Sequence, residues 1–309
     1  MTTIFEKDWF EKSTQIFTNE NGDVNLNNIG SLRKMDGYGF IVYAPSAILN
    51  IDCNNINFPD KSFNDKEVNP MDLSILDGGF VLKSSKSSGV CLIGMYEGCV
   101  LTMQNNSVFK IYNHIVNIAD NDISYFTANL YDESRFVIGE ASSENNSSLI
   151  IGGIYSIYNS SSIVINGSIN ATPVSFHSAD FYIYDNCYLE VNTVEVLTIN
   201  DSQFIVNLDE GNPSASFQST DGRLIFKFYS DDVKYEGIFN FSSKSKGCVN
   251  MDVLTTIAKP TIVNLINIKK MFSIDGDVVD DIEEYFYIDN KKTAIRNGVK
   301  VSIVTIIKK

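Results

Sequence analysis

Short runs of Val, Ile, Phe and Tyr alternate with clusters of Asn, Ser, Asp and Gly from about residue 38 to the end of the chain. Proline is scarce, at 6 residues, so little interrupts these runs. Runs of β-branched and aromatic residues bounded by turn-forming residues are typical of strands joined by turns. The pattern therefore predicts an all-β chain.

One eight-residue phrase recurs in the middle of the chain, at Tyr131–Ile138, Tyr158–Ile165 and Tyr184–Val191. Each copy begins with Tyr, continues with Asp or Asn, and ends in alternating apolar residues. Related copies lie at Tyr96–Met103, Gln104–Ile111 and Ile199–Val206.

The apolar residue at the centre of the phrase recurs at a nearly constant interval of about 27 residues, and a fixed period of this size is typical of solenoids. In a parallel β-helix, residues one period apart stack at about 4.8 Å, the ordinary spacing of strands. Since side chains alternate along a strand, two interior ladders separated by one outward position are expected. The first ladder is Phe109, Phe136, Ile163 and Leu189; the second is Ile111, Ile138, Ile165 and Val191; the outward positions are Lys110, Val137, Val164 and Glu190.

The turn before each ladder has its own regularity. Asn or Asp at its first position can bond to its own backbone and tolerate unusual dihedral angles. A small residue follows two positions later, and Cys187 and Cys99 are interpreted as members of this serine column. The two sets are Asn105, Asp132, Asn159, Asp185 and Asn200, and Ser107, Ser134, Ser161, Cys187 and Ser202.

Two related copies, centred on Leu101 and Phe204, do not obey the period. They are expected on other faces of the same coil. A sandwich or jelly roll is the alternative fold.

A solenoid needs its apolar coil ends covered. Residues 1–37 are expected to form an N-terminal cap or docking segment, because apolar residues from Ile4 to Phe17 follow a near-helical spacing. A terminal strand is the alternative. Residues 38–266 form the predicted β-solenoid. Residues 267–309 are expected to form a small β element that covers the coil end or mediates self-association.

The net charge, the first residues and the cysteines indicate which binding partners and which cellular compartment to expect. The net charge of −14 argues against nucleic acid and anionic membrane surfaces, which attract Lys and Arg. No run approaches the roughly 20 apolar residues of a membrane helix, so no membrane insertion is expected. The first residues lack a signal-peptide pattern, which indicates synthesis in a cytoplasm. The five cysteines form no C-x-x-C pair and are interpreted as free thiols.

Metal and cofactor chemistry has little support. His114 and His177 have no neighbour at metal-ligand spacing, and no phosphate-binding glycine motif occurs, so no cofactor and no metal are expected. The acidic run 275–284 breaks the order of a calcium loop and is interpreted as a solvated turn, with calcium there or at the acids near 209 and 231 as the alternative. A Cys/His nucleophilic pair that meets only in space is a further alternative.

Paired carboxylates in a groove would suit a glycosidase, in which one acid protonates the leaving group and the other activates water or attacks. The carboxylates are too many for the sequence to choose a pair. The candidates are Asp180, Asp185, Glu190, Asp209, Glu210, Asp231 and Asp232.

Three tyrosines are more specific candidates for a site. Tyr131, Tyr158 and Tyr184 recur with the coil and are out of phase with the inward Leu130, Ile157 and Ile183. They are expected to form an exterior column that offers flat apolar faces and polar edges to sugar rings or protein partners. Rings tucked against the core, or buried between subunits, are the alternatives.

The coil-length phrase, the expected cap and the distinct C-terminal piece resemble right-handed parallel β-helix proteins, in particular bacteriophage tail spikes and receptor-binding fibres. The resemblance covers about residues 75–250 and includes no catalytic motif. It implies a virion protein, a homotrimer, that binds a bacterial surface polysaccharide or other virion proteins. A polysaccharide depolymerase and a non-catalytic scaffold or adhesin-like repeat protein are the alternatives.

Overall fold

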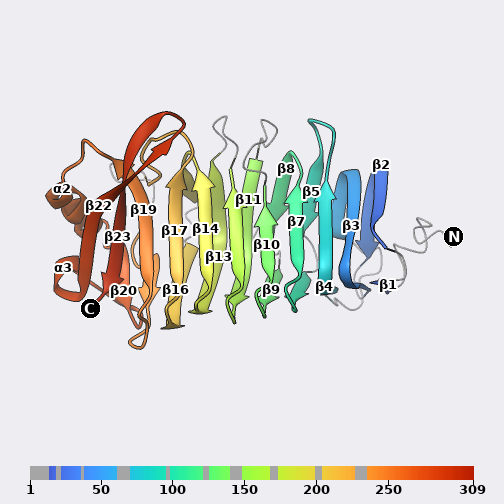
Figure 1. Ribbon diagram of the computed structural model, residues 1–309, viewed down its shortest axis with the longest axis horizontal. Coiled ribbons are helices and arrows are strands. Elements are labelled where there is room, and N and C mark those ends of the chain that lie inside the picture. Colours follow the sequence, from blue (N-terminus) through green and yellow to red (C-terminus); the bar gives the residue numbers. More distant parts are fainter. Residues whose placement is uncertain are drawn as a thin grey trace.

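A computed structural model describes residues 14–18, 22–35, 38–60, 70–94, 98–120, 125–139, 148–167, 173–198, 204–226 and 235–309. The chain forms a stack of coils, with the first described strands at one end and the C-terminus near the other (Figure 1). Within the stack, each described strand pairs in parallel with the equivalent strands of neighbouring coils. The parallel β-solenoid predicted from the period is confirmed.

The coils contribute strands to three faces, and long strands bend from one face to the next. Face one contains β1 (Gln15–Thr18), β6 (Cys99–Met103), β9 (Phe126–Leu130), β16 (Phe204–Gly211), β18 (Phe239–Phe241) and β20 (Phe272–Ile274). Face two contains β7 (Val108–Tyr112), β10 (Arg135–Ile138), β12 (Ser162–Asn166), β14 (Tyr188–Thr193), β17 (Ser214–Ser219) and β19 (Cys248–Leu254). Face three contains β5 (Val90–Ile93), β8 (Ile115–Ile118) and β15 (Val196–Thr198). The strands shared between faces are β2 (Val24–Met35), β3 (Gly39–Asp60), β4 (Met71–Lys83), β11 (Ser148–Ile157) and β13 (Val174–Asp185).

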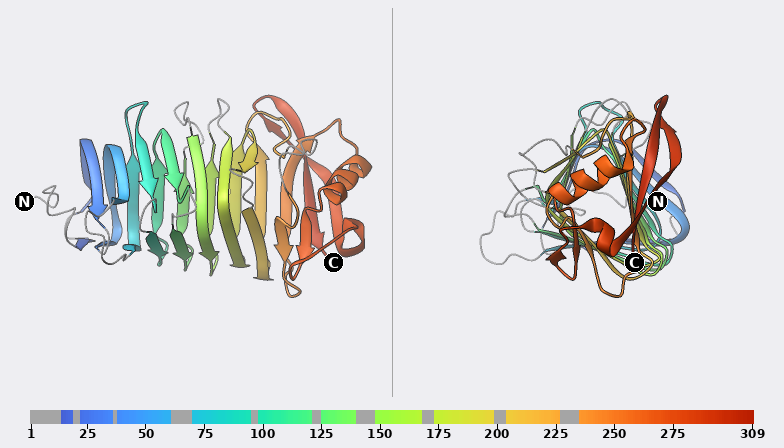
Figure 2. Two further views of the ribbon diagram at one scale, coloured as in Figure 1. Left: turned by 180° about the vertical axis from the view of Figure 1, so that it is seen from behind. Right: turned by 90° about the vertical axis from the view of Figure 1, so that its left-hand side faces the viewer.

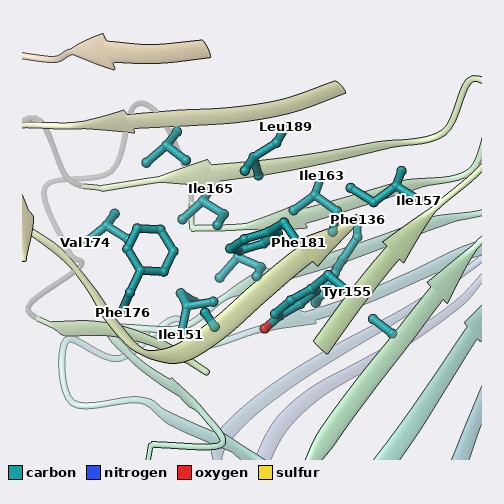
Figure 3. Close-up of a cluster of buried hydrophobic side chains, with 14 of the residues drawn as sticks. Phe136, Ile151, Tyr155, Ile157, Ile163, Ile165, Val174, Phe176, Phe181 and Leu189 are labelled. Atoms are coloured by element: carbon teal, nitrogen blue, oxygen red, sulfur yellow. The ribbon is translucent and has the colours of Figure 1, made fainter. Parts of the chain in front are cut away.

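The two interior ladders lie where the period places them. Phe136 pairs with Phe109 on one side and with Ile163 on the other, and Ile163 pairs with Leu189. All eight ladder side chains are fully buried. Figure 3 shows Phe136, Ile163 and Leu189 among the buried side chains of neighbouring coils. Burial of these apolar groups, at about 25 cal/mol per Å² of surface removed from water, is the main stabilising term.

The copies of the phrase that break the period do lie on other faces. Leu101 is on face one and Phe109 is on face two of the same coil, because β6 pairs with β9 while β7 pairs with β10. Phe204 is also on face one, whereas Leu189 is on face two, and Phe204 begins the next coil because β16 pairs with β13.

Val137 and Val164 occupy outward positions, as expected, but are only 6% and 4% exposed, because parity fixes the side of a sheet and neighbouring groups decide the exposure. One detail of the phrase prediction is wrong. Cys99 is not in the serine column: it begins β6 and pairs with Met71 and Phe126. A single small residue before an apolar run does not show which position of the coil that residue occupies. Cys187 does follow Ser134 and Ser161 in that column, and all five cysteines are free.

Residues 4–13 of the expected N-terminal cap lie outside the described residues. The segment Gln15–Thr18 is strand β1, parallel to β3, and not a helix. Ile16 is 57% exposed while Phe17 is fully buried, an alternation with the two-residue period of a strand.

The C-terminal segment adds short helices and antiparallel strands at the coil end. Helix α2 (Lys259–Ile268) lies across this end (Figure 2) and buries four apolar side chains. It starts before residue 267, inside the segment expected to be solenoid. Strand β23 (Val299–Lys308) runs antiparallel to β19 and to β22 (Phe286–Arg296). The short elements between are β21 (Asp277–Val278) and α3 (Ile282–Tyr285).

Hydrogen bonds from two basic side chains, Arg296 and Lys308, attach this segment to the stack of coils. Arg296 Nε donates a hydrogen bond to Asp252 Oδ2 at 2.7 Å, and the Asp252 side chain is 2% exposed. Lys308 Nζ donates to the carbonyl oxygens of Ser242 and Ser243. Strand β22 is the outermost strand, and its pairing with β23 is interrupted between Asp289 and Lys292.

Candidate functional site

The three candidate tyrosines form one exterior stack at the end of face one. The ring centroids of Tyr131 and Tyr158 are 5.1 Å apart, and those of Tyr158 and Tyr184 are 4.6 Å apart, with interplanar angles of 7° and 13°. All three side chains are half-buried, and their inward neighbours are fully buried. The exterior column is therefore confirmed.

Stacking covers most of the flat faces that the sequence led us to expect on this column. Each ring lies against the next, because the spacing of coils matches the separation of stacked rings. The face of Tyr158 is covered on both sides. Stacking leaves the ring edges, with their hydroxyl groups, as a row along the column.

The hydroxyl groups at one end of the stack are linked to a carboxylate. Tyr184 is hydrogen-bonded to Tyr158 and donates to Asp209. Burial, then the charge of Asp209, raises the pKa of Tyr184 to about 12. Burial also raises the pKa of Asp209, which the Tyr184 hydrogen bond partly opposes.

Beside the tyrosines runs a column of tight turns. In each turn, the amide of the small residue donates to the carbonyl three positions earlier, as Ser134 N does to Tyr131 O at 3.2 Å. Both central residues of three successive turns have positive φ, which defines a type I′ turn. Asn and Asp tolerate this conformation, so the sequence signal for the turns was sound. The pairs are Asn105 and Asn106, Asp132 and Glu133, and Asn159 and Ser160; Asp185 has positive φ in the next turn.

Hydrogen bonds join each turn to the next. Asn159 Nδ2 donates to Asp132 Oδ1 at 3.1 Å, and the Asn159 amide donates to Asp185 Oδ2 at 3.3 Å. The backbone amide of Glu133 donates to Asn159 O at 3.0 Å. These links hold the polar side chains in fixed positions at a spacing of one coil.

The turns line an open groove of about 630 Å³. Its lining consists entirely of carboxylates and amides. Three of these residues, Asp77, Asn106 and Glu133, were not singled out from the sequence, because the phrase marks only the first position of each turn and Asp77 lies outside it. The lining residues are Asp77, Asn105, Asn106, Asp132, Glu133 and Asn159.

The candidate carboxylates do not form one cluster. Asp180 and Asp209 both lie on face one, and burial raises the pKa of each. Asp180 pairs with Ile205, four residues from Asp209, which places the two about 13 Å apart along the strand. A glycosidase needs about 5–10 Å between its acids.

The other acids have separate surroundings. Asp185 is in the turn column, and Glu190 Oε1 on face two accepts a hydrogen bond from Asn192 Nδ2 at 2.8 Å. Glu210 is exposed and lies 3.9 Å from Lys244. Asp231 and Asp232 lie outside the described residues.

Metal-binding geometry is absent from the part of the chain that the structure describes, where no group of three or more His, Cys, Asp or Glu side chains could hold an ion. In the run 275–284, Asp281 Oδ1 instead accepts from Glu283 N at the start of α3, and Asp280 lies 3.0 Å from Lys270. Among the described helices, none has the length and apolar character needed to span a membrane.

Comparisons of the chain with protein-family models, with curated proteins and with solved structures give no match.

Proposed function

We propose that this protein is a rigid, non-catalytic binding rod whose turn column lies along an extended bacterial surface polysaccharide. The observation that carries the proposal is the groove of about 630 Å³, in which polar turns repeat once per coil along the rod. A polymer of repeating units and a surface of repeating turns can make the same contact several times.

The chemistry of the groove suits sugar hydroxyl groups. Amide groups both donate and accept hydrogen bonds, while carboxylates accept them. The neighbouring row of tyrosine hydroxyls adds further donors and acceptors. Because the bonds between turns already order these side chains, little conformational entropy is lost when a ligand binds.

The setting of this proposal is a bacteriophage particle, with the protein as a homotrimeric receptor-binding component. Its support is the resemblance of the coil phrase and end segments to β-helical tail spikes and fibres. Neighbouring virion subunits are the alternative occupant of the same surface.

The test uses variants that remove side chains from the groove and keep the turns. Glu133 and Asn159 have positive φ, a conformation that glycine adopts without strain, so the double variant Glu133→Gly/Asn159→Gly should fold normally. Asn297→Gly is the matched control, since Asn297 has positive φ and is exposed in the C-terminal hairpin. The probes are capsule and O-antigen polysaccharides immobilised on a sensor surface.

We expect the wild type and Asn297→Gly to bind the same polysaccharide, and the double variant to bind about tenfold more weakly. Two lost hydrogen bonds of about 0.5–1.5 kcal/mol each account for this factor. Equal binding by the double variant would overturn the proposal. So would silence across the panel together with stoichiometric incorporation into a particle, which would favour a scaffold. Shortening of the polysaccharide would establish a depolymerase.

A further inference from the structure

Strands β3, β4 and β7 are neighbours near one end of the rod (Figure 1). The corner between faces one and two carries a notch there. The corner of β4 is shorter than both neighbouring corners. One residue separates Asp77 from Gly79 in β4, whereas four separate their partners Tyr43 and Ile48 in β3.

The same shortening holds on the other side. Three residues separate Ile75 from Gly79, and four separate their partners Met103 and Val108 in the next coil. The corner of β4 is therefore recessed between two longer corners.

Glycine makes the recess possible. Gly78 has φ of +83°, and a Cβ atom there would lie 2.2 Å from the carbonyl oxygen of Ala44. The neighbouring Gly79 leaves the side of Ile48 uncovered by any side chain of its own, and Ile48 is 43% exposed. Because Gly78 and Gly79 are successive glycines, β4 takes a shorter path at the corner, and no side chain of theirs fills the space outside it.

The notch has a volume of about 340 Å³, within the range of about 300–1,000 Å³ for small-molecule sites. Ile48, Val81 and Val108 supply apolar surface. Asp77 and Lys110 place one carboxylate and one ammonium among the polar groups, so the charges balance. The full lining is Ser46, Ala47, Ile48, Asp77, Gly78, Gly79, Val81, Asn106, Val108 and Lys110.

This combination fits a neutral ring that carries hydroxyl groups. Its C–H surface would cover the valines and Ile48, while its hydroxyls would bond to Asp77, Asn106 and Lys110. Asp77 Oδ1 accepts a hydrogen bond from Gly78 N at 2.7 Å, which holds the carboxylate at the notch.

The notch is continuous with the turn-column groove, because Asp77 and Asn106 line both. On the side away from the groove, the longer corner of β3 bounds it, with Ser46, Ala47 and Ile48 in the lining. A polymer that follows the groove would meet this corner and stop.

We propose that the notch binds the terminal monosaccharide of the polysaccharide, so that the rod recognises chain ends. The inference deepens the proposed function and rests on it for the polymer. Binding of a single sugar in the notch can be measured separately.

The test measures saturation-transfer NMR signals of six free monosaccharides: D-glucose, D-galactose, D-mannose, L-rhamnose, N-acetyl-D-glucosamine and N-acetyl-D-galactosamine. Val108→Trp fills the notch from an outward, partly exposed position. Ser214→Trp is the matched control, since Ser214 lies in the same outward column several coils away. Lys110→Gln removes the ammonium group without adding bulk, and thermal melts verify that each variant is folded.

We expect at least one sugar to bind the wild type and Ser214→Trp, to lose its signal with Val108→Trp, and to bind Lys110→Gln several-fold more weakly. If none of the six sugars gives a signal with the wild type, or if the signal is unchanged with Val108→Trp, the proposal that the notch binds a sugar is overturned. If polysaccharide binding is lost in Glu133→Gly/Asn159→Gly while no single sugar binds, the proposed function stands and the notch fails. If a sugar binds in the notch while the polysaccharide binds Glu133→Gly/Asn159→Gly as tightly as the wild type, the notch stands and the proposed function fails.

Discussion

The rings of Phe109 and Phe136 lie 5.0 Å apart and only 2° from parallel, although a full repeat of the chain separates them. Phe80 continues the stack at 5.2 Å from Phe109. Aromatic residues in register on successive coils thus add ring contacts to the burial of their apolar surface.

The first prediction concerns this ladder. Phe136→Ala should lower the free energy of unfolding by about 3–5 kcal/mol, because it removes a fully buried ring and leaves a cavity. Arg135→Ala, one position away at an exposed site, should change it by less than about 0.5 kcal/mol. Urea denaturation followed by circular dichroism measures both. Equal stability of the two variants would contradict the ladder.

The link between Tyr184 and Asp209 can be tested by titration. In Tyr184→Phe the hydroxyl is lost, so the pKa of the Asp209 carboxyl should rise further above its ordinary value. The tyrosine that titrates near pH 12 should also disappear. Carboxyl carbon shifts in NMR report the first change and ultraviolet absorbance the second. Tyr43→Phe, at an exposed site, is the control; a shift of Asp209 in that variant as well would refute the link.

The bond between Arg296 and Asp252 should be important for the C-terminal segment. Arg296→Met leaves a buried carboxylate without its cation, which costs about 3–5 kcal/mol. Arg223→Met is the control, because Arg223 is 84% exposed in its pair with Asp221 and should contribute less than about 1 kcal/mol. Hydrogen exchange of β22 and β23 should accelerate only in the first variant. Equal exchange rates in both would count against a fastening role.

Asp180 predicts a specific dependence of stability on pH. Burial raises its pKa above 3.8, so the folded state binds the proton more tightly than the unfolded state does. Its contribution is therefore favourable at low pH and is lost as the pH rises through the folded pKa. Asp180→Asn removes this loss. Its midpoint of thermal unfolding should exceed that of the wild type at pH 7, and the difference should vanish below pH 3.8. A difference that does not vary with pH would show that charge is not the cause.

The turns predict opposite effects for one substitution at two sites. Glu133 has φ of 60° in a type I′ turn, where glycine is preferred, so Glu133→Gly should stabilise the protein by about 0.5–1 kcal/mol. Glu190 lies within β14, where glycine weakens a strand, so Glu190→Gly should destabilise it by a similar amount. Thermal melts compare the two variants, and a loss of stability in both would contradict the turn assignment.

The features that depend on the repeat period of the chain could be predicted from the sequence. The stacking of Phe136 on its neighbours and the position of Tyr158 follow from the regular repeat, because hydrogen-bonded coils must align equivalent residues. It did not predict that Tyr158 is covered on both faces, since ring orientation is set by the neighbouring rings. The notch was also missed, because Asp77–Gly79 departs from the repeated phrase and its effect depends on the longer corners beside it.

The final strands of the molecule have a consequence for its assembly. A stack of parallel coils ends in unpaired backbone groups that could accept another molecule and grow into filaments. Here β23 reverses the strand direction, and β22 presents Lys291 and Lys292 together with a break in its pairing. Charged side chains and irregular edges hinder further strand addition. Strand addition at the β22 edge is therefore hindered by the chain itself.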